Sequence, residues 1–180
     1  MKKTIKNLFL PIICALISIS FTSAFFTDNA PVPNNTFSSG TASNTDIIIN
    51  EFVPDPVGGD DAPMPNGEWI ELYNKGKWTI NVDGWVLDAG GVGIQISSLI
   101  TDTGNTSIAP GGYLVVYGNG SPGIVLVNTG DTVNLRLFSG GVVIDTYTYT
   151  SIGEGKSWAR VPNAGSSWVI TDPTKGDPNV

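Results

Sequence analysis

From residue 46 to the end of the chain, short runs of β-branched and aromatic residues alternate with turns of glycine, proline, asparagine and aspartate. No stretch of this region keeps a helical period, and strand-length runs separated by turns are typical of an all-β sandwich. We expect strands at 47–53, 68–74, 78–88, 93–98, 113–117, 132–139, 142–150 and 157–161. The pattern therefore predicts one domain of about seven to nine strands, long enough to bury a core.

Two local patterns support this interpretation. Ser139-Gly140-Gly141 separates two apolar runs, which is a strong hairpin signal. In 68–74, the period of two places Ile70 and Leu72 on one face and Glu71, between two aromatic residues, on the other. Both faces are thus partly apolar, as expected for a central strand.

The first 24 residues have the three-part layout of a secretory signal. Three lysines precede the apolar run 8–21, and the small residues 22–24 follow it. The run is shorter than the roughly 20 residues of a membrane-spanning helix, and Pro11 interrupts it. We expect cleavage after Ala24, no membrane span afterwards, and a secreted or cell-surface protein. An uncleaved anchor and lipid attachment at Cys14 are the alternatives.

The composition of the remainder excludes several functions. The chain has no histidine, and its one cysteine would leave with the signal, so the commonest general base and the thiol nucleophile are both absent. Removing the three signal lysines leaves six Lys and Arg against 16 Asp and Glu, a net charge of −10. This acidity disfavours nucleic acid as a partner.

Residues 25–45 form a polar segment that we interpret as a flexible linker. The segment is rich in asparagine, serine, threonine and proline and has no apolar period. Its start at 24–28, with Asn35-Thr36-Phe37 and Gly40, resembles the region after the signal in camelysin-like surface proteins. The likeness covers only about twenty residues, so we interpret it as a relic or a processing signal rather than a working domain.

Six motifs in order carry a wider resemblance over 46–180. They are Gly67–Asn74 (GEWIELYN), Gly84–Asp88 (GWVLD), Pro110–Val116 (PGGYLVV), Asn128–Leu135 (NTGDTVNL), Gly155–Pro162 (GKSWARVP) and Gly176–Asn179 (GDPN). Together they resemble the lamin tail domain of prokaryotic secreted proteins. The resemblance implies an immunoglobulin-like sandwich that binds or tethers. The chain carries no heptad rod and no prenylation motif, so we do not expect filament assembly or nuclear-membrane attachment.

Paired carboxylates are the remaining route to catalysis. Glu68 and Glu71 are three residues apart, so in a strand they point to opposite faces and cannot flank one bond. We expect Glu71 to be held by hydrogen bonds from the backbone or from an arginine, Arg136 or Arg160. The sequence therefore predicts no catalytic residues.

An acidic loop offers candidate calcium ligands. Asp55, Asp60 and Asp61 lie in one loop, and Glu68 follows it. Calcium takes several oxygen ligands from such loops, but the spacing matches no EF-hand. We favour a solvated acidic loop with no cofactor, and calcium binding is the alternative.

The tryptophans suggest a contact surface. Trp69, Trp85 and Trp158 lie in the motif strands, where we expect them in the core. Trp78 and Trp168 lie nearer turns and are the better candidates for an exposed contact, for example with a glycan.

These observations predict a noncatalytic secreted or cell-surface module for adhesion, tethering or scaffolding. Its expected partner is another extracellular or surface protein, although a glycan stays open. The alternatives are a carbohydrate-binding surface module and a calcium-stabilised protein that assembles with itself.

Overall fold

The computed structural model describes residues 42–118 and 123–180, which belong to one compact unit, Ser39–Val180. The predicted signal, Cys14 and the linker residues before 42 lie outside the described residues. No helix within the described ranges is long and apolar enough to span a membrane.

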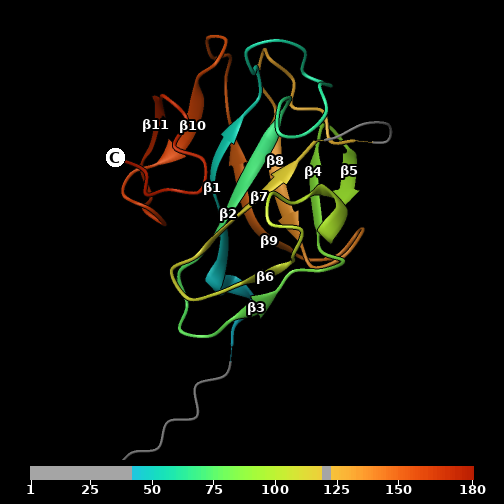
Figure 1. Ribbon diagram of the computed structural model, residues 1–180, viewed down its shortest axis with the longest axis vertical. Coiled ribbons are helices and arrows are strands. Elements are labelled where there is room, and N and C mark those ends of the chain that lie inside the picture. Colours follow the sequence, from blue (N-terminus) through green and yellow to red (C-terminus); the bar gives the residue numbers. More distant parts are fainter. Residues whose placement is uncertain (1–41, 119–122) are drawn as a thin grey trace, which may run out of the picture. The chain divides into compact units, whose positions relative to one another are not determined.

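The described residues form an all-β sandwich (Figure 1). A five-stranded antiparallel sheet has the order β11-β10-β1-β2-β7, a four-stranded sheet has the order β5-β4-β8-β9, and β3 pairs with β6. The strands are β1 (Ile47–Val53), β2 (Trp69–Asn74), β3 (Ile80–Asn81), β4 (Val86–Ala89), β5 (Val92–Gln95), β6 (Ser107–Ile108), β7 (Tyr113–Tyr117), β8 (Thr132–Arg136), β9 (Val143–Thr148), β10 (Ser157–Arg160) and β11 (Trp168–Thr171), with 3-10 turns at Asn44–Asp46 and Ser98–Ile100. The predicted fold class is confirmed.

The core lies between the two larger sheets. Phe52 and Leu72 enter it from the five-stranded sheet, while Leu87 and Leu135 enter it from the four-stranded sheet, and all four are fully buried. Burying a side chain of this size stabilises the fold by about 1.5–3 kcal/mol. Alternation along β2, β4 and β8 supplies Leu72, Leu87 and Leu135, whereas in β1 a register shift after Ile49 turns Phe52 to the core.

The sequence predicts one strand at 78–88 with a bend or bulge at Asp83-Gly84, and the chain does bend there, but the bend separates two strands. A turn divides this segment into β3 and β4, because Asp83 donates its N–H to the side chain of Asn81 and Trp85 donates to the carbonyl of Val82. Gly84 adopts a φ of 79°, which a residue with a side chain rarely takes. The strands β6 and β11 were not predicted.

The two larger sheets are connected by hydrogen bonds at a bulge in β1. The pairing of β1 with β2 shifts between Ile49 and Glu51. Arg160 donates to the carbonyl of Ile49, and Asp145 of β9 accepts the N–H of Ile49. Arg160 and Asp145 also form an ion pair, 3.1 Å between nitrogen and oxygen, with both side chains largely buried. Asp145 thus reaches the backbone of the bulge from the opposite sheet, and Arg160 reaches it from β10 of the same sheet.

Candidate functional site

Of the four edges of the larger sheets, β7 is covered in part by a further segment, and β9 carries an inward-turned charge. Along β7, Thr101 forms a bridge with Val116, and Asp102 exchanges hydrogen bonds with the backbone of Val115. Along β9, Asp145 accepts the N–H of Thr146 while it pairs with Arg160. A charged group turned inward on an edge discourages pairing with another strand.

The other two edges, β5 and β11, are open. Neither strand contains a charged residue or a proline, and no further strand of the described residues joins either one. In β11, Val169 is 38% exposed and Ile170 is 51% exposed. Val161 donates to the carbonyl of Ser167, so in this antiparallel ladder the N–H and carbonyl of Ile170 face away from β10. These groups are available to a further strand.

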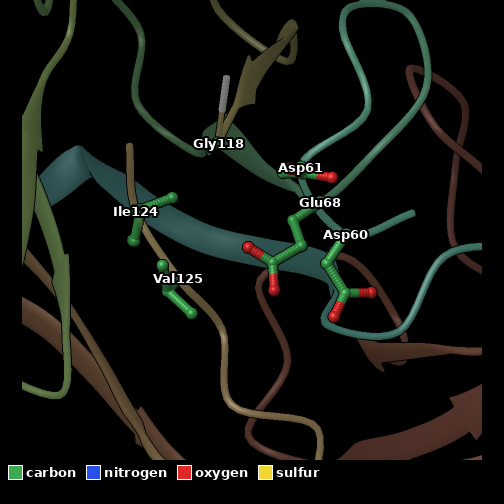
Figure 2. Close-up of a pocket in the computed structure, with 6 residues that line it drawn as sticks. All are labelled: Asp60, Asp61, Glu68, Gly118, Ile124 and Val125. Atoms are coloured by element: carbon green, nitrogen blue, oxygen red, sulfur yellow. The ribbon is translucent and has the colours of Figure 1, made fainter. Parts of the chain in front are cut away.

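The acidic loop contributes to a hollow of about 310 Å³. Asp60, Asp61 and Glu68 line it on one side, and Ile124 and Val125 line it on the other. Figure 2 shows the carboxyl group of Glu68 extending into the space between Asp60 and the segment 124–125.

Glu68 keeps its proton more readily than an ordinary glutamate. Only 3% of the residue is exposed, and burial raises the pKa of its carboxyl group to about 8. The N–H of Leu126 donates to one carboxyl oxygen and lowers the pKa, whereas the negative charge of Asp60 raises it. At neutral pH the hollow therefore holds a mostly protonated carboxyl group, which is a poor cation ligand.

The candidate calcium ligands do not converge. Asp60 and Asp61 line the hollow, and Asp60 accepts a hydrogen bond from Asn128. Asp55 is not among the lining residues, and its carbonyl accepts the N–H of Gly155. Within 42–118 and 123–180, no three Asp, Glu, His or Cys side chains are grouped so that they could hold a metal ion. Calcium binding stays a prediction without a formed site.

Glu71 is held by the backbone and by an amide. It accepts hydrogen bonds from the side chain of Asn50, at 2.9 Å, and from the N–H of Gly176. Burial raises the pKa of Glu71 to about 7 despite these donors. The expected backbone bond is confirmed, and the alternative of Arg136 or Arg160 was wrong, because each arginine pairs with an aspartate. Glu68 and Glu71 contact different segments, so they do not form a catalytic pair.

The tryptophans differ in how far they are exposed to solvent. Trp85 is buried in the core and Trp158 packs against it, as expected, whereas Trp69 is buried in a separate apolar cluster. Trp78 is 49% exposed. Trp168 is half-buried, because its ring stacks on Tyr147 at 4.0 Å between centroids and Arg160 lies 4.6 Å from the ring centre. The structure thus leaves Trp78 accessible and commits Trp168 to packing.

The lamin tail domain model matches residues 40–151, more than half of the chain. This chain belongs to the lamin tail domain family. No curated protein and no solved structure matches it. The lamin tail domain is a non-enzymatic, immunoglobulin-like domain, and membership supports a β module for protein interaction.

This lamin tail domain extends beyond the matched residues. Both β10 and β11 follow residue 151, yet β10 pairs directly with β1 at Glu51 and Phe52. The open edge β11 is therefore specific to the part of the sandwich outside the family match. Sequence patterns missed it because Trp168–Thr171 is only four residues long and has no alternation of apolar and polar residues.

Proposed function

We propose that this lamin tail domain is a noncatalytic secreted or cell-surface module that tethers another protein through its open edge. The observation that carries the proposal is β11, where exposed Val169 and Ile170 accompany unpaired backbone groups. An extended segment of a partner can add to such an edge as a further strand. The signal-like residues 1–24 support the extracellular location.

The chemistry of the domain restricts the partner. The chain has a net charge of −7, and β11 offers apolar side chains rather than charges. A neutral or basic segment rich in β-branched residues matches this surface better than an acidic one. The partner is therefore an extracellular protein that presents such a segment, either for adhesion or for assembly of a scaffold.

The test is a pull-down with the chain from Phe25 to Val180 as bait. Fractions of surface proteins, cell-wall glycan and extracellular DNA are offered separately, and retention of one protein species is expected. Ile170→Pro removes an N–H that faces away from β10, so it leaves the β10–β11 ladder intact and blocks a further strand.

A matched control distinguishes the edge from general stickiness. Leu99 is 81% exposed and lies outside both larger sheets, so Leu99→Lys removes an exposed apolar side chain without changing β11. Retention should be lost with Ile170→Pro and kept with Leu99→Lys. Equal retention of the protein by both variants would contradict the proposal.

A carbohydrate-binding surface is the second candidate, favoured by the exposure of Trp78. An aromatic ring exposed near a turn can stack on a sugar ring. In that case the glycan fraction would be retained, and Trp78→Ala would abolish its retention while Ile170→Pro would not. Trp168 is not suited to this role, because its ring already stacks on Tyr147.

A further inference from the structure

The end of the chain folds over the outer face of the five-stranded sheet, the face turned away from the core. We call residues 174–179 the strap. A second apolar cluster of Val53, Trp69, Val115 and Tyr117 lies on this face. The cluster is separate from the main core, and it provides the apolar floor beside which the strap is held.

Two buried carboxyl groups receive the first half of the strap. Glu51 and Glu71 are direct cross-strand partners in β1 and β2, and both are fully buried. Glu51 accepts the N–H groups of Thr174 and Lys175 and the hydroxyl of Thr174, while Glu71 accepts the N–H of Gly176. Lys175 and Gly176 have φ angles of 25° and 84°, and this turn aims successive N–H groups at the carboxyl groups.

An asparagine anchors the other end of the strap. The side chain of Asn179 donates to the carbonyl oxygens of Asn50, at 3.1 Å, and Arg160, at 2.9 Å. Its backbone N–H donates to the side chain of Asn163, and its amide oxygen shares the hydroxyl hydrogen of Thr174 with Glu51. The bond between Asn179 and Thr174 lies within the strap and preorganises it.

A lysine adds the third anchor. The ammonium group of Lys175 lies 5.0 Å from the ring centres of both Trp69 and Tyr117 and donates to the carbonyl of Pro65 at 3.1 Å. Burial lowers the pKa of Lys175. Two aromatic faces and a carbonyl form a site for one ammonium group.

We propose that this face is a peptide-binding site, which the strap fills within its own molecule and which the strap of a second copy can fill in its place. Every hydrogen bond just described comes from residues 174–179, so the strap carries its complete recognition chemistry. The groups that receive it lie mostly on β1, β2 and β10. The exposed Asp172 and Pro173 alone join the strap to β11, so a change in this short connection suffices for exchange between copies. This interaction uses a different surface from β11.

The first test measures binding of a fluorescent peptide with the sequence of residues 172–180 to full-length proteins. In the wild type the strap occupies the site and competes. The strap variant Thr174→Ala/Lys175→Ala/Asn179→Ala keeps the backbone donors but loses the side-chain bonds and the ammonium group, so its own strap competes less well. We expect it to bind the peptide at least tenfold more tightly than the wild type does, by fluorescence anisotropy. Adding Glu51→Ala to the strap variant should abolish binding of the peptide. A strap variant that keeps a cooperative thermal transition but does not bind the peptide would overturn the proposal.

The second test asks for exchange between copies. The strap variant keeps an intact site, whereas the Glu51→Ala variant keeps an intact strap. Each protein alone should be monomeric, and an equimolar mixture should form a heterodimer in size-exclusion chromatography with light scattering. Peptide binding without a heterodimer would overturn the exchange. If the triple variant fails to fold, Lys175→Ala/Asn179→Ala takes its place in both tests, because it removes the ammonium contacts and the side-chain bonds to Asn50 and Arg160 but keeps Thr174.

Discussion

Two regions of the domain bury glutamates in opposite ways. Glu51 and Glu71 lie side by side beneath the strap, which supplies hydrogen-bond donors to both. Glu68 accepts one bond, from the N–H of Leu126, and faces a hollow. A buried carboxyl group that accepts several hydrogen bonds can anchor a chain segment. A buried carboxyl group that accepts a single hydrogen bond keeps its proton more readily. Burial raises the pKa of both groups, to about 7 for Glu71 and to about 8 for Glu68.

The largest expected effect comes from removing an anchor of the strap. Glu51→Ala leaves the N–H groups of Thr174 and Lys175 without their acceptor, and we expect a loss of about 3 kcal/mol in the free energy of unfolding. Urea unfolding measures it. As a control, Asp172→Asn should change stability by less than about 0.5 kcal/mol, because that carboxyl group is exposed and forms a surface ion pair with Lys156. Equal losses in the two variants would erase the distinction between anchor and surface pair.

The next effect depends on pH. Glu68 and Glu71 have folded-state pKa values above their ordinary value of 4.5. The folded protein therefore binds more protons than the unfolded chain between pH 4.5 and 8, so these groups make stability fall as pH rises through this window. Their contribution is fully present below pH 4.5 and lost above about pH 8.

The variant Glu68→Gln measures how much of this pH dependence of stability comes from Glu68. Glutamine still offers an oxygen to Leu126 but cannot ionise. We expect it to stabilise the protein at pH 9, on the order of 2 kcal/mol, and to be nearly neutral at pH 4.5. Thermal unfolding of wild type and variant across this range measures the difference. If the Tm of the variant equals that of the wild type at every pH, folding does not raise the pKa of Glu68.

A smaller effect is expected at the lysine of the strap. Lys175→Met keeps an apolar stem of similar length but loses the ammonium group above Trp69 and Tyr117. We expect the free energy of unfolding to fall by about 1 kcal/mol, measured by thermal unfolding. Trp69 fluorescence should change at the same time, because the cation leaves its ring. No change in either measurement would remove Lys175 from the anchors of the strap.

The smallest effect is expected at the rim of the hollow. Asp60→Asn removes a charge that faces solvent and an amide, so stability should change by less than about 0.5 kcal/mol. Millimolar calcium should leave the Tm of wild type within about one degree, because the three aspartates of the loop do not converge. A clear rise with calcium, lost in Asp60→Asn, would establish a calcium site instead.

Some of this architecture could be predicted from sequence and some could not. The bounds of β1 and β7 follow from β-branched and aromatic runs that end at Pro54 and begin after Gly112. The fold class follows from the turns and from six motifs. The position of Glu51 beside Glu71 depends on register across two strands, and a bulge shifts that register. No linear pattern reports such a shift.

The candidate sites were harder to predict than the fold. The strap reaches Glu51 across more than one hundred residues, and nothing near Glu51 in the sequence signals it. Trp168 looked exposed because it follows a polar turn, but Tyr147 and Arg160 approach it from other strands. Trp78 is 49% exposed, as is common for a residue in a turn.

The pairing of β1 with β10 also has a consequence for how the chain folds. Glu51 of the first strand lies opposite Ala159, so the first strand acquires its neighbour on that side only after nearly the whole domain has been synthesised. Until then the nascent chain presents β1 with one unpaired side, and long-range pairing of this kind slows folding. The strands β10 and β11 are therefore needed to complete the largest sheet, because without them one side of β1 would stay unpaired.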